Sequence, residues 1–389
     1  MAVDSCELLF SGDIMCQIPL NDACKTESGY DYDPVFEPVY GLLSRADYVV
    51  GNLETPIAGE ARKYSWERYI FNTPVEFAQA VKKAGFDLVS LANNHCMDRD
   101  LGGLYMTLEN LDKVGLASVG TSRSSRERKR CFIADINSIQ IGFLAYTYGI
   151  NSQHHRMYLP QGTEFAVNLI QPPENLEGAI NLLEPETVGA HTEELYRQPN
   201  RVFDETIAHY YQQIADDIDR LRSHGAELVV MLLHCGGQYD DTPDAYTREV
   251  VHRLCKMKID AIICNHQHVI HPFEMMGDVP VAWCLGNFVH SNYMTPHPKM
   301  CPYSALFHLK AERAGGRPRF VEASVTLTKT VVNDRGISQV HTVAELMENS
   351  RGRALESLKK DAAKYMEILY GKAARDQAFD ETMILWQRG

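Results

Sequence analysis

Residues 88–98 read LVSLANNHCMD, and the interpretation of the whole fold starts from them. A short apolar run, typical of a buried strand, ends in Asn93, Asn94 and His95, and Asp98 follows three residues after the histidine. Open α/β sheets place their chemistry just beyond the carboxyl ends of their strands. An amide, an imidazole and a carboxylate this close together can bind a metal, move a proton or hold a phosphate. These residues alone do not choose among the three.

Composition limits the classes of protein to consider. The chain has 389 residues, of which 45% are hydrophobic and 23% charged, as in folded soluble proteins. Its length allows roughly two domains, or one large α/β domain with insertions. A net charge of -13 argues against a general affinity for nucleic acid or for an anionic membrane. No apolar run approaches the roughly 20 residues of a membrane span, so we expect no membrane partner.

The cysteines and the first residues predict the compartment. Ten cysteines lack any paired spacing, which favours reduced thiols. The first residues, MAVDSCELLFSGD, lack the basic start and long apolar core of a signal peptide. Both observations predict a cytoplasmic protein.

Short apolar runs alternate with amphipathic stretches along most of the chain, which predicts an α/β layered sandwich. Residues 151–203 are rich in proline and irregular, so we expect an insertion there within a domain of residues 1–340. Residues 341–389 are charged and predict a helical C-terminal extension. The predicted strands cover 7–13, 46–54, 86–95, 226–237, 259–268 and 279–291, with a hairpin over 131–149 and antiparallel strands over 307–332. The predicted helices cover 74–85, 101–115, 205–223 and 247–258.

Five of these strand ends carry side chains that can ligate a metal. Carboxylates and imidazoles together suit divalent Mn, Fe or Zn. Two such ions about 3.5–4 Å apart can clamp the attacking and leaving oxygens of a phosphoryl displacement. At strand spacing, the last two histidines of the set face the same side. In chain order the residues are Asp13, Asn52 and Glu54, Asn94 and His95, His234, and finally His266 and His268.

Each of these residues also has a purely structural explanation. An aspartate after a strand, such as Asp13, commonly caps a helix. Asn94 suits an Asx turn, and a single histidine such as His234 is more often a satisfied core or surface residue. Their joint occurrence at five strand ends of one fold pattern favours a site.

Two further features have competing interpretations. Cys96, Cys235 and Cys264 stand beside three of the motifs. A thiolate is a good soft ligand, but a buried cysteine more commonly packs as a small apolar residue, and we favour packing. The basic run RSSRERKR at residues 123–130 could hold a phosphorylated or acidic substrate, although such runs are more often solvated loops.

Six motifs in order carry a resemblance to a known family. They are GDIM at 12–15, GNLE at 51–54, ANNH at 92–95, LHCGGQY at 233–239, NHQH at 265–268 and CLGNF at 284–288. Together they resemble the bacterial capsule-synthesis CapA family, the poly-γ-glutamate capsule proteins of the calcineurin-like metallophosphoesterase superfamily. The resemblance spans residues 7–290. It implies a four-layer α/β/β/α sandwich with mixed sheets, followed by the helical tail.

The resemblance also implies a role for each matching residue. One or two divalent ions, Mn, Fe or Zn, would be bound at the strand ends. His95 would face the substrate as a general acid, and Asp98 is well placed to orient it. The implied metal ligands are Asp13, Glu54, Asn94, His234, His266 and His268, and the implied substrate contacts are Asn52, Asn93, Gln238 and Asn287.

Some positions depart from the superfamily pattern. Met15 stands where a second aspartate or histidine is usual, which leaves open whether one ion binds or two. Cys235 and Gln238 replace a common tryptophan and glutamate, and Asn265 replaces a glycine. The loss of a charge at Gln238 leaves the substrate open more than it affects the metal.

Three hypotheses of function follow. The leading one is a metal-dependent hydrolase that cleaves a phosphoester or phosphodiester by metal-bound hydroxide, with His95 as general acid. The second is a soluble enzyme that hydrolyses or transfers poly-γ-glutamate or γ-glutamyl amide bonds. The third is a non-catalytic binding module. In each case we expect an anionic small molecule or polymer as the ligand, and the charged tail is compatible with a homo-oligomer.

Overall fold

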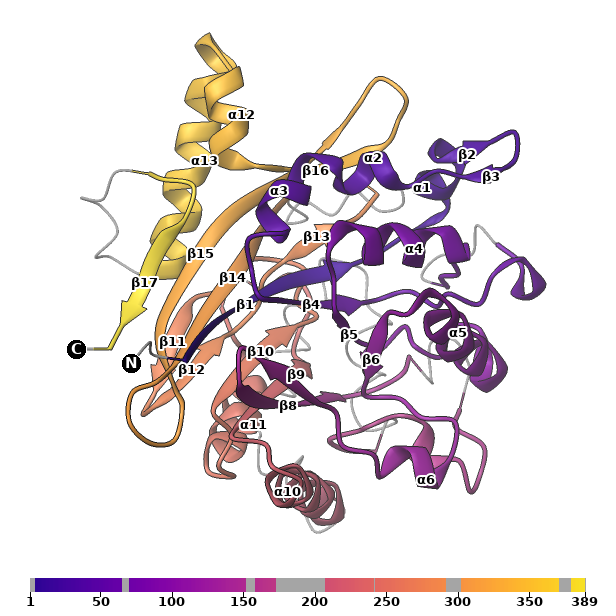
Figure 1. Cartoon of the computed structure of the whole chain (residues 1–389). Coiled ribbons are helices and arrows are strands. Elements are labelled where there is room, and N and C mark those ends of the chain that lie inside the picture. Colours follow the sequence, from indigo (N-terminus) through magenta and orange to yellow (C-terminus); the bar gives the residue numbers. More distant parts are fainter. Residues whose placement is uncertain are drawn as a thin grey trace.

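The computed structural model describes residues 4–64, 70–151, 158–172, 207–240, 242–291, 302–370 and 379–388. Two β-sheets lie face to face within this part of the chain, and helices cover their outer faces (Figure 1). The predicted four-layer sandwich of mixed sheets is therefore confirmed. Most of the insertion expected at 151–203 lies outside the described residues.

The first sheet holds nine of the described strands. β1 is parallel to β4 and β13, and the parallel run continues through β5 and β6, so their carboxyl ends meet at one edge. On the other side of β1, the strands β14, β15 and β16 are antiparallel, as predicted for residues 307–332. In chain order the nine are β1 (Asp4–Ile14), β4 (Tyr48–Leu53), β5 (Leu88–Ser90), β6 (Ala117–Val119), β13 (Asn287–Val289), β14 (Tyr303–Arg313), β15 (Arg319–Val332), β16 (Ser338–Thr342) and β17 (Met383–Gln387).

The second sheet holds six of the described strands, in the order β11-β12-β10-β9-β8-β7. Its members are β7 (Ile133–Ile136), β8 (Ile139–Thr147), β9 (Leu228–His234), β10 (Ala261–Asn265), β11 (Phe273–Met276) and β12 (Val279–Ala282). The four central strands are parallel, and β7 pairs with β8 as the predicted hairpin. A separate pair, β2 (Lys25–Thr26) and β3 (Gly29–Tyr30), forms a small hairpin.

Alternate residues of each strand enter different apolar layers, because successive side chains point to opposite faces. Phe10 of β1 packs between the sheets with Val230 of β9. Their neighbours Leu9 and Val229 face outward into separate clusters with the helices. Burial on both faces explains why these strands read as continuous apolar runs.

Helices supply the two outer layers. Five of them contribute to the cluster outside the first sheet: α1 (Ile18–Ala23), α2 (Asp33–Phe36), α3 (Tyr40–Leu43), α4 (Val75–Ala84) and α5 (Asp100–Val114). The second sheet is covered by α10 (Ala208–Ser223) and α11 (Ala245–Cys255). The short α6 (Ser125–Arg128) follows β6. α4 and α5 end at left-handed glycines, Gly85 and Gly115, as the sequence predicts.

The single strand predicted over residues 279–291 is wrong. The segment forms β12 in the second sheet and then β13 in the first. The chain crosses at Gly286, whose φ is 74° and whose carbonyl accepts the Asp13 amide at 2.9 Å. A Cβ at Gly12 would lie 1.9 Å from that carbonyl oxygen, so the crossing requires glycine at position 12. It sets Asn287 beside Asp13.

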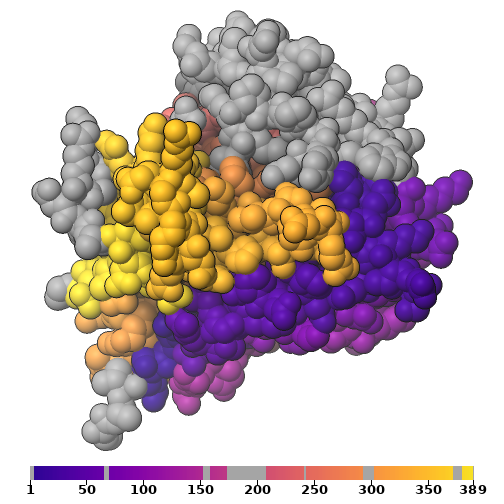
Figure 2. Space-filling model, turned by 90° about the horizontal axis from the view of Figure 1, so that it is seen from above, coloured from indigo at the N-terminus to yellow at the C-terminus, as the bar shows by residue number. Residues whose placement is uncertain are grey.

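The C-terminal segment is helical as predicted over α12 (Val343–Asn349) and α13 (Gly352–Tyr370). The strand β17, which pairs with β15, was not predicted. Tyr365 and Met366 of α13 belong to the same apolar cluster as Phe307 of β14. Figure 2 shows the yellow C-terminal residues lying directly against the orange strand residues. No helix in the described ranges combines the length and apolarity needed to span a bilayer.

Candidate metal centre

Five of the predicted ligands come together where the two sheets meet. Asp13 lies near the end of β1 and Glu54 directly after β4, in the first sheet. His234 ends β9, and His266 and His268 follow β10, in the second sheet. The relative exposure of all five is at most 3%.

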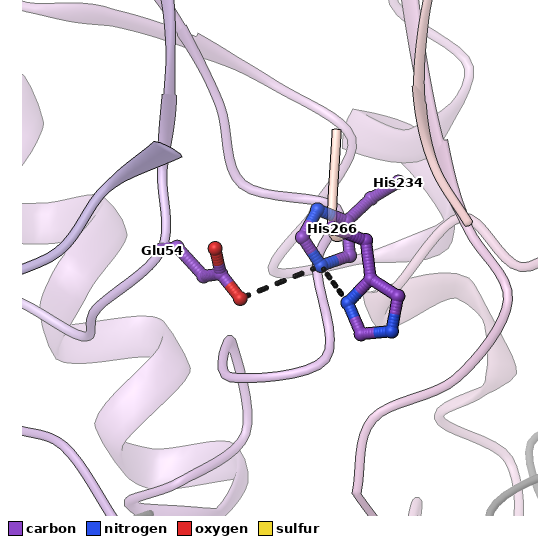
Figure 3. A group of neighbouring side chains, drawn as sticks. All are labelled: Glu54, His234 and His266. Carbon is purple, nitrogen blue, oxygen red and sulfur yellow. Dashed lines mark hydrogen bonds and ion pairs between the residues drawn. The ribbon is translucent and has the colours of Figure 1, made fainter. Parts of the chain in front are cut away.

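These residues form two potential metal-binding groups that share one carboxylate. The first contains Glu54, His234 and His266, and the second contains Asp13, Glu54 and His268. Within each group the ligand atoms lie within 4.8 Å of one another. Figure 3 shows Glu54 and His266 approaching His234 from different sides in the first group. Glu54 belongs to both groups, so its carboxylate could contact an ion held by either group.

The first group converges on His234. Its Nε2 lies 3.5 Å from Glu54 Oε1 and 3.0 Å from His266 Nδ1. The side-chain oxygen of Asn94 is 2.8 Å from the same nitrogen. Two imidazole nitrogens and two oxygens thus meet at one point, a donor set that suits Mn, Fe or Zn.

The second group is built around Asp13. Its Oδ2 lies 3.2 Å from His268 Nδ1, and its Oδ1 accepts a hydrogen bond from Asn52 Nδ2 at 2.8 Å. His268 Nδ1 is also 2.8 Å from Asn287 Oδ1, which the crossing at Gly286 brings beside Asp13. The two predicted substrate contacts Asn52 and Asn287 therefore touch candidate ligands directly.

Asn93 and Gln238, also predicted to contact substrate, have different surroundings. Asn93 Nδ2 donates to Leu53 O at 2.9 Å and lies 3.3 Å from Asn52 Oδ1, so this amide holds the β4 end in place. Gln238 is half-buried after β9, and no hydrogen bond between described residues joins it to the cluster. A substrate role for either residue stays a prediction.

His95 stands beside the two groups. Its Nδ1 is 2.7 Å from Asp98 Oδ2, which also accepts the Phe71 amide at 2.7 Å. Its ring stacks on Phe71 with centroids 4.1 Å apart. Its Nε2 is 4.0 Å from Glu54 Oε1. One ring nitrogen is therefore held by Asp98, and the other is near the shared carboxylate.

Burial and charge repulsion shift the ionisation of the cluster. Burial, followed by the neighbouring Asp13 charge, raises the pKa of Glu54 well above its ordinary value. Burial and the adjacent imidazoles lower the pKa values of His234 and His266 well below theirs. The two histidines are thus neutral and keep lone pairs for a cation.

The buried carboxylate of the cluster that lacks hydrogen-bond partners suits a bound cation. Both carboxylate oxygens of Glu54 are buried without a hydrogen-bond partner among the described residues. An ionised carboxylate buried in this way is strongly unfavourable unless a proton or a cation compensates it. Divalent ions would compensate Glu54 and use the neutral imidazoles at the same time. The residues therefore fit one or two divalent ions.

The prediction that strand spacing places His266 and His268 on the same face is wrong. β10 ends at Asn265, so neither histidine lies on the strand. Both have positive φ angles, 112° for His266 and 60° for His268. The turn sends the two imidazoles to different groups of ligands, although both still reach the site.

The sequence did not predict three of the residues that lie at or beside the candidate ligands. Phe71 stacks on His95, and Asn151 Oδ1 accepts from Asn94 Nδ2 at 3.2 Å. Neither follows a motif, so only the structure finds them. His290 is buried beside His268, and burial lowers its pKa to about 4. A histidine three residues after Asn287 was the available clue.

The three cysteines next to the motifs pack as apolar residues. Cys96, Cys235 and Cys264 are buried, and neither potential metal group includes a described cysteine. Burial raises the pKa of each thiol, which disfavours the thiolate form that ligates metals.

Comparison with known proteins adds a family and named relatives. A family model described as "Bacterial capsule synthesis protein PGA_cap" matches residues 7–292. "Capsule biosynthesis protein CapA" of Bacillus anthracis is 25% identical over 264 residues, 67% of this chain and 54% of that protein. "PGA biosynthesis protein CapA" of Bacillus subtilis (strain 168) is 25% identical over 348 residues, 88% of this chain and 77% of that protein. The chain thus spans about half the length of the B. anthracis relative.

Among solved structures, TT1561 of Thermus thermophilus aligns over 77% of this chain and 93% of that protein. Its sequence identity is 9% and its TM-score is 0.35.

Proposed function

The chain belongs to the bacterial capsule synthesis protein PGA_cap family, and on that premise we propose that it is a metal-dependent hydrolase of phosphoesters. One observation carries the proposal: two potential metal groups share Glu54, and a histidine–aspartate pair lies beside that carboxylate. A site built only to bind an ion would need the ligands but not the His95–Asp98 pair.

The ligands have a defined task in this proposal. Asp13, Glu54 and His268 would hold one ion, and Glu54, His234 and His266 the other, with Asn94 contributing its oxygen. When bound, divalent ions lower the pKa of a coordinated water and neutralise charge on phosphoryl oxygens. Asn52 holds the Asp13 carboxylate in position through its 2.8 Å hydrogen bond.

His95 would act as the general acid. Asp98 accepts a hydrogen bond from Nδ1–H and so fixes the tautomer of the neutral ring. Phe71 holds the ring plane by stacking and helps to place Asp98 through its amide. In the protonated ring, Nε2 would donate its proton to the leaving oxygen as the P–O bond breaks.

The test is hydrolysis of an aryl phosphodiester by the protein loaded with Mn²⁺. We expect activity that is lost in the double variant Asp13→Ala/His266→Ala, together with the bound metal. His252→Ala is the matched control, because this histidine is exposed on α11. Circular dichroism would establish that each variant is folded. Undiminished hydrolysis by the double variant would contradict the proposal.

A second candidate is supported by the name of a relative. The B. subtilis protein is called a PGA biosynthesis protein. The same ligands could promote attack on the carbonyl of a γ-glutamyl amide, by hydrolysis or transfer. Incubation with γ-glutamyl peptides, followed by mass spectrometry, separates the two candidates. Cleavage of peptides without cleavage of phosphodiesters would favour the amide chemistry.

We also propose that the protein acts in the cytoplasm, which is a reducing compartment. Nine of its cysteines lie in the described residues, and all nine are free thiols. Thiols remain reduced in the cytoplasm, whereas secreted proteins commonly form disulfides. Fractionation of the producing cells tests this placement.

A further inference from the structure

A cavity lies apart from the candidate metal centre. It has a volume of about 320 Å³ and lies where β6, α6, β8 and α10 come together (Figure 1). That volume is at the lower end of the range for small-molecule sites, roughly 300–1,000 Å³. Its lining includes none of the candidate metal ligands. The basic run at 123–130, which the proposed function does not use, supplies part of its wall.

The charges around this cavity do not balance. Four arginines and three carboxylates line it, which leaves one positive charge in excess in a chain whose net charge is -13. Arg128 and Arg220 share a single carboxylate, Asp217, at 2.7 and 2.6 Å. Arg130 is exposed at the rim and forms no ion pair with any described residue. An anion would complete the pairing of these guanidiniums.

Two buried polar atoms in the wall also lack partners. Thr121 is 9% exposed and Asn168 8%, and both line the cavity. Neither Thr121 Oγ1 nor Asn168 Oδ1 has a hydrogen-bond partner among the described residues. The side-chain nitrogen of Asn168 donates a hydrogen bond to Ala145 O at 3.0 Å. This bond sets the orientation of the amide and leaves its oxygen, Oδ1, to accept a hydrogen bond from another group. Buried polar groups are ordinarily satisfied by protein, water or a ligand, so these two atoms are available to a polar partner.

From these observations we infer that the cavity binds a small oxyanion that also carries a hydroxyl or ammonium donor. The guanidiniums of Arg128, Arg130 and Arg220 would face the anionic group. Asn168 Oδ1 would accept from the donor group, and Thr121 Oγ1 would bond to either part. A phosphorylated sugar and an acidic amino acid both offer this chemistry.

The wall of this cavity is connected through the backbone to the loop that carries Asn94. Gly120 O accepts the Asn168 amide at 2.9 Å, and the Asn168 carbonyl accepts the Thr147 amide at 2.9 Å. A Cβ at Gly120 would lie 2.6 Å from that of Ala92, two residues before Asn94. The binding site is thus separate from the metal centre but built on the same framework.

The test is isothermal titration calorimetry with glucose 6-phosphate and, separately, L-glutamate. EDTA is present throughout, so the metal centre and the proposed hydrolysis do not contribute to the measurement. We expect one of the two probes to bind with one site per chain. Its affinity should fall about tenfold or more in Arg130→Gln, which removes a charged donor, and in Thr121→Val.

Arg126→Gln is the matched control, because Arg126 belongs to the same basic run and is exposed but does not line the cavity. It should leave the affinity unchanged. Phosphodiester hydrolysis should also stay unchanged in Arg130→Gln and Thr121→Val, since neither residue contacts the metal centre. Failure of both probes to bind, or an equal loss of affinity in Arg126→Gln, would overturn the inference. So would full affinity in Arg130→Gln and in Thr121→Val.

Discussion

Replacing Glu54 by glutamine in the metal-free protein tests whether this carboxyl is forced to carry a proton. Glutamine keeps the size of the side chain and removes its charge. Burial and the Asp13 charge raise the pKa of Glu54 above the ordinary 4.5, so the native state retains a proton that the unfolded state loses. The free energy of unfolding therefore falls as pH rises above about 4.5, by at most about 1.4 kcal/mol per pH unit. The fall ends once the native pKa is passed.

The buried histidines act with the opposite sign. The pKa values of His234 and His266 are lowered from 6.5, so below that pH the unfolded state binds protons that the native state does not. The two histidines therefore make the free energy of unfolding rise with pH up to about 6.5, and above that pH their contribution is constant. Because the wild type and Glu54→Gln share these histidines, the difference between the two proteins isolates Glu54. For a chain of 389 residues, the limiting slope corresponds to about 2 °C in Tm per pH unit.

The assay is urea unfolding followed by tryptophan fluorescence between pH 5 and 9 in EDTA. We expect Glu54→Gln to become progressively more stable than the wild type as pH rises, and then to keep a constant advantage. Added Mn²⁺ should remove the pH-dependent loss in the wild type, because the cation replaces the proton on Glu54. Glu356→Gln, an exposed substitution on α13, is the control. A difference that does not vary with pH would refute the reasoning.

Three further predictions concern the ion, the acid and the crossing of the chain. Removing metal with EDTA should lower Tm by about 3 °C relative to protein held at 100 times the Kd of Mn²⁺, and calorimetric scans check this. An unchanged Tm would mean that no ion stabilises the fold. His95→Gln should reduce kcat about 10²–10⁴-fold for an alkyl phosphoester and much less for a p-nitrophenyl ester, whose leaving group needs no acid. Equal losses on both substrates would argue against the acid role. Gly12→Ala should lower the free energy of unfolding, measured with urea, by about 1–3 kcal/mol or more, because the added methyl group would clash with the Gly286 carbonyl. Gly41→Ala, with open space around it, should cost nothing.

The sequence predicted which candidate ligands come together because its clues are local. An apolar run that ends in a polar ligand identifies the carboxyl end of a strand, and parallel strands bring those ends together. Asp13, Glu54 and His234 reach the cluster for this reason. The family predicted from the six motifs is confirmed by the match over residues 7–292.

Strand pairing was harder to predict from the sequence, because an apolar run does not show which strand it pairs with. The apolar pattern of residues 279–291 would be the same for one strand in one sheet or for two strands in two sheets. In the structure, the turn at Gly286 divides the segment into two strands. The positive φ angles of His266 and His268 are likewise set by tertiary contacts and not by periodicity. β17 is five residues long and follows a charged helix, so its pairing with β15 depends on long-range packing.

Residues that support the site from loops could not be predicted at all. Phe71 reaches His95 across 24 positions of sequence, and no period or motif marks it. Asn151 reaches Asn94 across 57 positions. The excess positive charge of the cavity near α6 could not be predicted for the same reason, because the paired residues Arg128 and Asp217 are 89 positions apart in the sequence.

The division of the metal ligands between two sheets has a mechanical consequence. Glu54 follows a strand of one sheet and His266 follows a strand of the other, so an ion held by both would join two sheets that also pack against each other through an apolar layer. The measured affinity for that ion would then include the free energy of closing the two sheets on each other. A substitution that leaves a cavity in the apolar layer between the sheets, such as Val230→Ala, would therefore weaken binding of the ion although it changes none of the ligands.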